Sequence, residues 1–507
     1  MNGSQVHPAA QINIGKLQLF VAGVVIVIAA LMLTLATARG GPTRMVFFLA
    51  GAAVVAWFFF GRFAWWIPVP LAVAFGGLFW VGFRIYVHEA ALLLSVFALT
   101  PTLAMNWKQM EQDRPALPAY VYLLAIYTVL HLFASLVLVR MFEGSGYGNI
   151  LRSYTIALWP MVFMILFYNF GSSRQIRLVI TLMIALYLFR IIFGMYVYYF
   201  PQFIFVPHLN LLFSEFGVVE LRTVSVRLFI IALGLFVLWR SIMAKGFLLL
   251  FMAIILWVGT FGGARIAVGQ FILILALYTV LRRKYALAIV VGTVLITTIV
   301  YLNMNPEVLY RLPFLPSRAL SVLVFSEETR IHAHLEGSDE WHRELFHSGL
   351  TKWLDNPITF FLGNRIYPFD EGWTAMAISF HERLDIASRV GRYEKGLWSI
   401  LATLGLMGGV LYALTFFFLL KDPAISLWRN RISDMPHLIY FVAVIHIVMW
   451  VAFCWIWGHF PSYELMFAGL AKAVYEDQKR KKANADAAAA KNGMIPGIPD
   501  TVPASGG

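Results

Sequence analysis

About fourteen apolar runs, most of them close to 20 residues long, divide this chain, and a helix of that length crosses the hydrocarbon core of a bilayer. Only 13% of the 507 residues are charged, against about a quarter in soluble proteins, so a water-soluble fold could not hide this much apolar surface. The pattern predicts an all-α polytopic membrane protein with about 12–14 transmembrane helices. The runs lie at 17–37, 45–61, 63–83, 86–104, 119–139, 153–170, 178–200, 228–243, 246–262, 266–281, 285–302, 397–420, 438–456 and 458–474.

Basic residues between the runs indicate the orientation, because lysine and arginine are retained on the cytoplasmic side. They are more frequent in the turns that are cytoplasmic when the N-terminus is inside, which predicts that both termini are cytoplasmic. The basic run Lys479-Arg480-Lys481-Lys482 then also lies inside, where basic residues favour anionic lipid. The opposite short loops hold Arg39, Arg44, Arg84, Arg140, Arg152, Arg222, Arg227 and Arg265.

Charge and cysteine content exclude several classes of function. The formal net charge of +13 is spread between the apolar runs, so it indicates membrane topology rather than a nucleic-acid partner. The single cysteine, Cys454, excludes an internal disulfide and any site with several cysteine ligands. The sequence has no P-loop, Gly-x-Ser-x-Gly or dinucleotide-binding pattern in a strand–helix context, and we expect no cofactor.

Two segments between the runs, 201–227 and 303–396, are long enough to form structure outside the membrane. The second holds 13 of the chain's 26 acidic residues and five of its 12 histidines, so we expect it to be the chemical end of the molecule. Apolar periodicity in pieces such as 340–354 predicts short helices packed over the membrane. The predicted parts are N-terminal transmembrane helices (1–302), the large loop (303–396), C-terminal transmembrane helices (397–475) and a disordered cytoplasmic tail (476–507).

Two arginines within or beside the apolar runs are candidates for a binding site. Arg265 follows Gly262-Gly263-Ala264 at the outer end of a span, where a guanidinium could grip a lipid-linked phosphate or diphosphate. The alternative is an arginine that extends to the lipid headgroups. Arg190 lies in the middle of a run, where a charge usually faces a cavity or a partner. A structural ion pair with a carboxylate such as Glu89 is the alternative there.

The large loop adds further candidates close to its end. Arg389 and Arg392 lie just before the next span, near the headgroup plane, whereas most loop arginines are expected to be solvated or paired with nearby acids. His381 is a candidate substrate-binding group, and either His381 or Glu382 could act as an acid/base group. The loop histidines show no recognised zinc spacing, so we expect no metal.

Three motifs along the chain resemble those of the O-antigen ligase/polymerase superfamily, which comprises bacterial inner-membrane polysaccharide polymerases and ligases. The polar pair Glu394-Lys395 is followed, after nine residues, by Gly405-Leu406-Met407-Gly408, as where the superfamily's large loop closes. Trp353-Leu354-Asp355-Asn356-Pro357 with Leu362-Gly363 looks like its Trp, Asn-Pro and Gly element. Gly262-Gly263-Ala264-Arg265 is similar to its arginine motif.

The resemblance implies a GT-C-like, metal-independent glycosyltransferase in the bacterial inner (plasma) membrane, with 303–396 as a periplasmic loop. Its donor would be an undecaprenyl-diphosphate-linked glycan and its acceptor a hydroxyl of a glycan or a lipid. Membrane lipids and other polysaccharide assembly proteins would be its partners. In the ligases the first member of the polar pair is a histidine proposed to activate the acceptor, and Glu394 in that place favours a polymerase-type member.

These motifs and positions suggest a role for each candidate residue. We expect Arg265, Arg389 and Arg392 to hold the diphosphate, Arg190 and His381 to contact substrate, and Glu394 to act as the base or to orient substrate. For Glu394 the alternative is an acid that stabilises the first turn of the following span. Two other functions stay open: a transporter or flippase for lipid-linked saccharides, and a non-catalytic scaffold.

Overall fold

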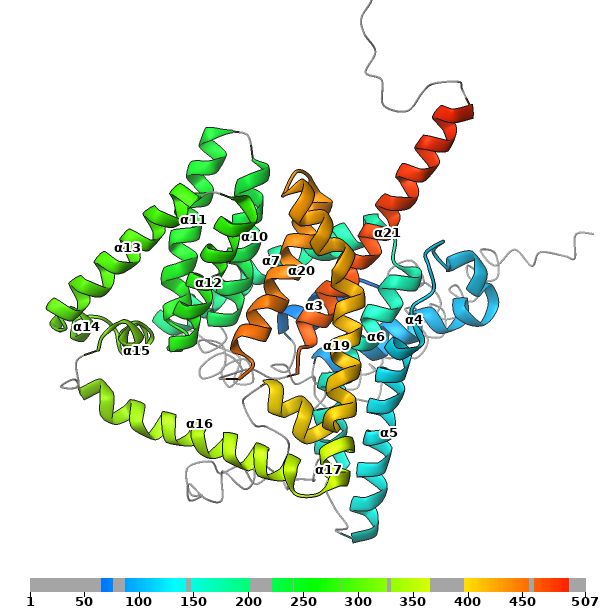
Figure 1. Ribbon diagram of the computed structural model, residues 1–507, viewed down its shortest axis with the longest axis horizontal. Coiled ribbons are helices and arrows are strands. Elements are labelled where there is room, and N and C mark those ends of the chain that lie inside the picture. Colours follow the sequence, from blue (N-terminus) through cyan, green and yellow to red (C-terminus); the bar gives the residue numbers. More distant parts are fainter. Residues whose placement is uncertain are drawn as a thin grey trace, which may run out of the picture. The chain divides into compact units, whose positions relative to one another are not determined.

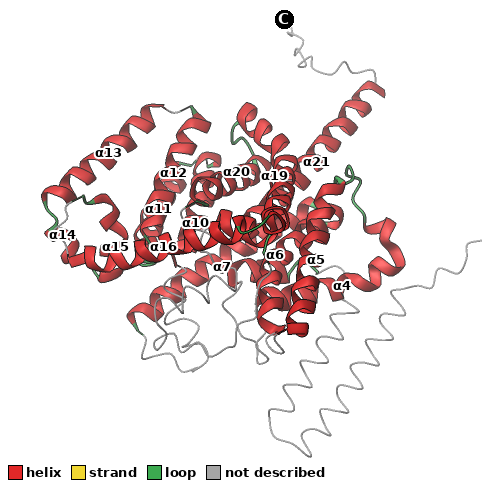
Figure 2. Cartoon of the chain, turned by 60° about the horizontal axis from the view of Figure 1, so that its bottom comes forward, coloured by secondary structure: helices red, strands yellow, loops and turns green. Residues whose placement is uncertain are grey.

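The computed structural model describes residues 65–75, 87–142, 147–200, 221–239, 241–283, 285–325, 330–364, 396–455 and 460–491 (Figure 1). In these ranges every regular element is a helix (Figure 2), which confirms the predicted all-α class for the described part of the chain. The chain divides into two compact units, Met1–Glu111 and Gln112–Gly507, which are described separately below.

The first unit contributes two described helices, α3 (Pro68–Phe75) and α4 (Val87–Met110), which pack against each other. Ser95 on α4 donates a hydrogen bond from Oγ to the carbonyl of Trp65, just before α3, at 2.7 Å. Both residues are fully buried, so this contact ties the two segments together. The predicted spans at 17–37 and 45–61 lie outside the described residues.

The second unit is a bundle whose long helices run back and forth between two ends (Figure 1). The turn between α19 and α20 and the C-terminal part of α21 lie at one end, called the tail end below. Helices α16 and α17 lie at the other, the loop end. The long helices of the bundle are α5 (Ala119–Phe142), α6 (Tyr147–Phe170), α7 (Ser173–Tyr199), α10 (Leu221–Leu238), α11 (Ile242–Thr260), α12 (Arg265–Arg282), α13 (Tyr285–Met304), α19 (Gly396–Asn430), α20 (Met435–Phe453) and α21 (Ser462–Lys491).

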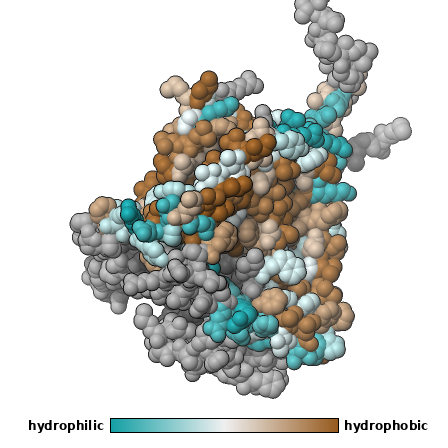
Figure 3. Space-filling view, turned by 60° about the vertical axis from the view of Figure 1, so that its left-hand side comes forward, coloured by the Kyte–Doolittle hydropathy of each residue, from teal (hydrophilic) through white to brown (hydrophobic). Residues whose placement is uncertain are grey.

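Seven helices among the described residues are long and apolar enough to cross a membrane: α5, α7, α10, α11, α12, α19 and α20. Shorter apolar stretches occur in α4, α6 and α13 and at 314–323. Large apolar side chains also lie on the outside of the bundle, with Ile192, Ile289 and Phe133 more than half exposed. Figure 3 shows such apolar residues over much of the visible surface, as expected for helices in contact with lipid. The chain is therefore a multi-pass membrane protein.

Four short elements and one long helix fill the described part of the segment between α13 and α19. The long helix, α16 (Arg330–Leu354), is one continuous piece of 25 residues, where the sequence predicts short helices. Phe346, Leu350 and Trp353 anchor it against Trp398 and Ala402 of α19. The short elements are α14 (Glu307–Tyr310), α15 (Phe314–Leu320), the 3₁₀ turn η3 (Ser321–Leu323) and α17 (Pro357–Leu362).

The C-terminal part of the chain corrects one prediction. A disordered tail is predicted from residue 476, but α21 continues as one helix to Lys491. Glu476 and Asp477 are buried against the bundle, and the stretch beyond them is rich in alanine and lysine, which favour helix. Residues 492–507 lie outside the described residues.

Candidate functional site

Of the residues that the sequence singles out, the structure describes Arg190 and Arg265. Arg265 is the first residue of α12 and is partly buried, and Arg190 lies inside α7 with 4% of its surface exposed. The other candidates, Glu394, Arg389, Arg392 and His381, lie outside the described residues. The alternative pairing of Arg190 with Glu89 would join the two units and stays a prediction.

A tight glycine turn places Arg265 at the loop end of the bundle. Gly263 has a φ of 63°, a conformation that favours glycine, and its N–H donates to the carbonyl of Thr260 at 2.9 Å. A Cβ added to Gly263 would lie 2.7 Å from the side chain of Leu315 on α15. The turn between α11 and α12 therefore packs directly against the short helix α15.

A second arginine, Arg222, lies beside the same turn. A Cβ added to Gly262 would come within 2.5 Å of the Cβ of Arg222, so the two backbones approach closely. Arg222 is the second residue of α10, and Arg265 is the first residue of α12. Two neighbouring helices thus have an arginine in their first turn at the same end, where the partial positive charges of the helix N-termini also favour anions.

The two other motifs meet at one point of the second unit. Gly363 ends α17 with a φ of 81°, and Gly405 interrupts α19 with a φ of 67° and a ψ of −173°. An added Cβ would lie 2.3 Å from the carbonyl oxygen of Thr403 at Gly363, and 2.3 Å from that of Phe361 at Gly405. The N–H of Asn364 donates to the carbonyl of Ala402 at 2.6 Å. The Asn-Pro–Gly segment and the Gly-x-x-Gly segment are therefore bound to each other through their backbones.

The phenol of Tyr127 on α5 reaches both partners of this glycine contact. Its hydroxyl lies 3.1 Å from the carbonyl oxygen of Leu362 and 3.0 Å from that of Leu404. These carbonyls belong to a helix end and a helix break, which leave backbone acceptors without helical partners. The ring of His131 packs edge-on against Tyr127 at 4.8 Å. Tyr127 therefore stabilises the break in α19.

Local physics explains the Asn-Pro–Gly segment. Asn356 caps α17 with its side chain, which accepts a hydrogen bond from the N–H of Thr359 at 3.0 Å, and Pro357 suits the first helical position. Gly363 supplies the positive φ that ends the helix. Trp353 lies before the cap, donates from Nε1 to the carbonyl of Phe360 at 3.0 Å and stacks on the ring of Phe360 at 5.0 Å.

Deep in the bundle, a second buried arginine accompanies Arg190. The guanidinium of Arg227 on α10 lies 3.5 Å from the ring centre of Tyr463 on α21, and Nη1 donates to the hydroxyl of Tyr187 on α7 at 3.3 Å. Tyr187 is fully buried, and the positive charges of Arg190 and Arg227 both lie close enough to interact electrostatically with its hydroxyl. Glu464 on α21 is close enough to attract Arg227. We call Tyr187, Arg190, Arg227, Tyr463 and Glu464 the buried arginine cluster.

The sequence prediction for Arg227 is wrong. The segment 201–227 is predicted to lie outside the membrane, but α10 begins at Leu221 and buries Arg227 to 6% exposure. Contact with two tyrosine rings from other helices, together with the attraction of the nearby Glu464 carboxylate, offsets the cost of burying this charge. Hydropathy along the chain cannot indicate these partners, because they come from α7 and α21. The sequence indicates burial of Arg227 only through the apolar run that continues directly after it.

His446 on α20 lies close to the same cluster. It is 3% exposed, its charge would interact with Arg227, and its ring packs at 4.7 Å from the ring of Phe467. Nδ1 is 2.7 Å from the carbonyl oxygen of Val442, which can only accept, so Nδ1 carries a proton. Nε2 is buried and has no hydrogen-bond partner among the described residues. Such an acceptor deep in a membrane bundle suits a water or a hydroxyl group.

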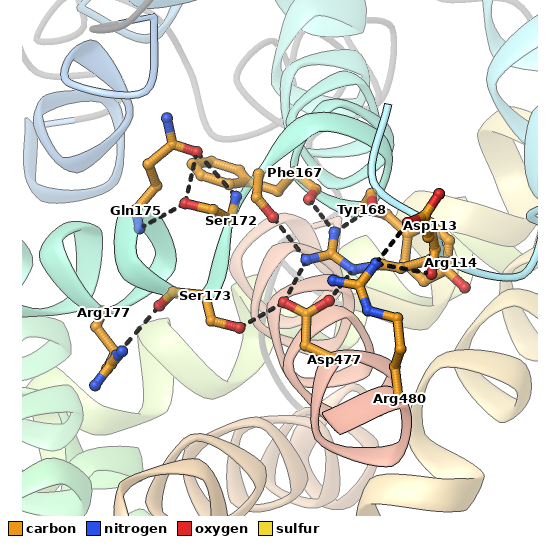
Figure 4. Close-up of polar contacts among 11 residues, drawn as sticks. Asp113, Arg114, Phe167, Tyr168, Ser172, Ser173, Gln175, Arg177, Asp477 and Arg480 are labelled. Carbon is orange, nitrogen blue, oxygen red and sulfur yellow. Dashed lines mark hydrogen bonds and ion pairs between the residues drawn. The ribbon is translucent and has the colours of Figure 1, made fainter. Parts of the chain in front are cut away.

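At the tail end, the structure forms an ion pair that links three segments (Figure 4). Arg114 donates from Nε and Nη2 to the two oxygens of Asp477 on α21, both at 2.8 Å. It also donates to the last carbonyls of α6, including that of Phe167 at 3.0 Å. Burial alone would raise the pKa of Asp477, but hydrogen bonds from Arg114 and Ser173 outweigh it and hold this pKa below its usual range.

Comparison with known proteins adds no relative. No protein family matches the chain, and no curated protein or solved structure is significantly similar to it. Within the ranges that the structure describes, no three His, Cys, Asp or Glu side chains come together as ligands for a metal ion. The arrangement offers three chemical features: paired arginines at the loop end, a buried arginine cluster and a broken helix.

Proposed function

We propose that this protein transfers a saccharide from an undecaprenyl-diphosphate-linked donor to an acceptor hydroxyl at the periplasmic face of the bacterial inner membrane. The transfer would serve O-antigen or exopolysaccharide polymerisation or ligation. The observation that carries the proposal is the pair of arginines, Arg222 and Arg265, in the first turns of neighbouring helices at the loop end. Guanidinium groups bind phosphate oxygens in bidentate fashion and stabilise a departing diphosphate.

The contact between Gly363 and Gly405 supports the same proposal. It joins α17, which belongs to the segment between α13 and α19, to the span that follows this segment. Glu394 precedes the first residue of α19 by two positions, and Arg389 and Arg392 precede Glu394. All three of these candidates therefore belong to the chain segment that leads into α19, the helix that contacts α17 at Gly405.

In the proposed reaction, the acceptor oxygen forms a bond to the anomeric carbon of the donor sugar. The bond between that carbon and the diphosphate oxygen breaks, and undecaprenyl diphosphate leaves with the electron pair. The acceptor proton passes to the carboxylate of Glu394, and Arg265, Arg389 and Arg392 stabilise the negative charge on the diphosphate. No metal is needed because the guanidinium groups provide this stabilisation.

The test is transfer of labelled glycan from an undecaprenyl-diphosphate donor by the purified full chain, with EDTA present. We expect Arg265→Ala and Glu394→Gln each to lower the rate by about 100-fold or more, as losses of a charge-stabilising group and of a general base do. Arg429→Ala is the matched control, because Arg429 is exposed in the last turn of α19 at the tail end. Product ladders indicate a polymerase, and single additions indicate a ligase.

Loss of transfer counts only for variants that keep the thermal stability of the wild type. Equal rates for Arg265→Ala and Arg429→Ala would contradict the role given to Arg265. Absence of transfer by the wild type with several donors and acceptors would contradict the catalytic proposal itself.

A second candidate function is transport or flipping of a lipid-linked saccharide. Two observations favour it: the buried arginine cluster brings charges from three helices into the bundle, and Gly405 breaks a membrane-spanning helix. Transporters often bind their substrates with intramembrane charges and discontinuous helices. Movement of a labelled lipid-linked saccharide across proteoliposomes, lost in Arg227→Gln but kept in Arg265→Ala, would favour this function over transfer.

A further inference from the structure

A small cavity lies at the tail end of the second unit, beside the ion pair of Arg114 and Asp477. Its volume is about 170 Å³, enough for roughly six water-sized groups. Its walls come from the first turns of α7 and α20 and from α21. The lining residues are Ser173, Arg177, Pro436, Ile439, Val474, Asp477, Gln478 and Lys481.

Two side chains make the rim of this cavity cationic. Arg177 and Lys481 are both exposed, and neither has a carboxylate partner among the described residues. Arg177 donates one hydrogen bond, from Nε to the carbonyl of Ser173 at 3.3 Å, which leaves the terminal nitrogens of its guanidinium for another acceptor. Figure 4 shows Arg177 and Ser173 on the same stretch of α7, close to Asp477.

The one acid in the lining does not cancel this charge. Both oxygens of Asp477 accept hydrogen bonds from Arg114, and Oδ2 also accepts from Ser173. Gln478 is occupied in the same way, because its Oε1 accepts from the hydroxyl of Tyr440 at 2.7 Å. Arg177 and Lys481 therefore remain as the charged groups of the lining that can receive an anion.

The inner wall of the cavity is apolar, and its level in the bundle is that of a membrane boundary. Pro436, Ile439 and Val474 form this wall. The spans of α7 and α20 begin at Ser173 and Met435, so the rim lies where a bilayer's headgroups meet its acyl chains. A site with two cations at its mouth and apolar residues behind them suits an amphiphile with a negative head.

We propose that this cavity binds the phosphate headgroup of an anionic phospholipid, with Arg177 and Lys481 on the phosphate and the first methylenes of the lipid against Ile439 and Val474. The site is separate from the proposed glycosyl transfer, since it lies at the opposite end of the bundle. It couples lipid binding to the packing of α7, α20 and α21, because all three helices contribute lining residues.

The chain offers its own control for a test. Lys479 and Lys482 belong to the same basic run as Lys481 and are exposed, but they do not line the cavity. The double variant Arg177→Gln/Lys481→Gln and the control double variant Lys479→Gln/Lys482→Gln remove the same number of charges. All four positions are exposed, so we expect both proteins to fold.

The measurement is native mass spectrometry of the full chain in detergent, titrated with phosphatidylglycerol or phosphatidylcholine. For the wild type we expect binding of phosphatidylglycerol that is tighter by about tenfold, and we expect Arg177→Gln/Lys481→Gln to lose this preference. The control double variant should keep it within about twofold.

Three outcomes would overturn the proposal. A wild type that binds both lipids equally has no anionic headgroup site. Equal losses in the two double variants would assign the effect to the charge of the tail rather than to the cavity. If millimolar inorganic phosphate or glycerol 3-phosphate displaces phosphatidylglycerol completely, the ligand is a free phosphate and not a lipid.

Discussion

Gly363 and Gly405 lie backbone to backbone, each with a positive φ, and neither position has room for a Cβ atom. The contact joins two motifs that are separated along the chain: the end of the short helix α17 and the first third of the membrane-spanning helix α19. The break in α19 therefore depends on α17 being in place, and α17 depends on the break.

Substitution of Gly405 by alanine should destabilise the protein by about 2–4 kcal/mol, because it adds both backbone strain and a steric clash. Thermal unfolding of the purified protein in detergent would show this as a lower midpoint. Gly292→Ala is the matched control: a Cβ at this position in α13 meets nothing within 4 Å. The control should be neutral or slightly stabilising, since alanine favours helix over glycine. Equal midpoints for the two variants would contradict the tight contact.

Removal of the Tyr127 hydroxyl should weaken the same junction. Tyr127→Phe leaves the ring in place and deletes the hydrogen bond to the carbonyls of Leu362 and Leu404, at an expected cost of about 1 kcal/mol. The measurement is again thermal unfolding, with Tyr285→Phe as the control because Tyr285 is 67% exposed. A double variant with Gly405→Ala should cost less than the sum of the two single changes, because both act on one contact.

Arg227 should be essential for the packing of the buried arginine cluster. Arg227→Lys keeps the charge but loses the planar guanidinium over Tyr463 and its hydrogen bond to Tyr187, and we expect a loss of about 2–3 kcal/mol of stability. Arg429→Lys, at an exposed position, should change stability by less than about 0.5 kcal/mol. If Arg227→Lys is as stable as the wild type, a point charge suffices and the stacking geometry carries no energy.

Acid should selectively weaken the Arg114–Asp477 contact. The pKa of Asp477 is held below its usual range, so its contribution to stability is complete above the unfolded value of about 3.9 and disappears as the pH falls through the lower, folded value. We therefore expect Asp477→Asn to be less stable than the wild type by a constant amount between pH 5 and pH 7, with a shrinking difference below about pH 4. Unfolding midpoints measured against pH test this. Asp486→Asn, an exposed change on the same helix, should show no such difference.

The sequence predicts the helical class, and seven of its predicted runs overlap described helices that are long and apolar enough to cross a membrane, because a run of apolar residues is a local property that survives folding. The run at 266–281 falls within α12, whereas the run at 228–243 extends beyond the end of α10 at Leu238 and into the start of α11. The residues at which helices begin and end are harder to predict from apolar runs. Arg227 is predicted to lie in a loop because its own charge opposes burial, whereas Tyr187 and Tyr463, which make burial favourable, come from helices distant in sequence.

In the candidate site, too, local features can be predicted from the sequence, whereas contacts between separate segments cannot. The glycine turn before Arg265 follows from local chemistry, and its position at the start of a span is visible in the sequence. The approach of Arg222 to Gly262, and the contact of Gly363 with Gly405, depend on how separate segments pack. The helix as far as Asp477 likewise depends on a contact between separate segments, with Arg114, whereas the alanine and lysine residues beyond it favour helix by their own propensity.

Helix α21 fixes a rotational phase between two charged contacts. Glu464 attracts Arg227 near its start, and Asp477 binds Arg114 about 20 Å further along the axis. At 100° per residue, one residue inserted between them would turn Asp477 away from Arg114, whereas seven inserted residues would nearly restore its direction and displace it by about 10 Å. The two contacts therefore fix the rotational register of α21 between residues 464 and 477.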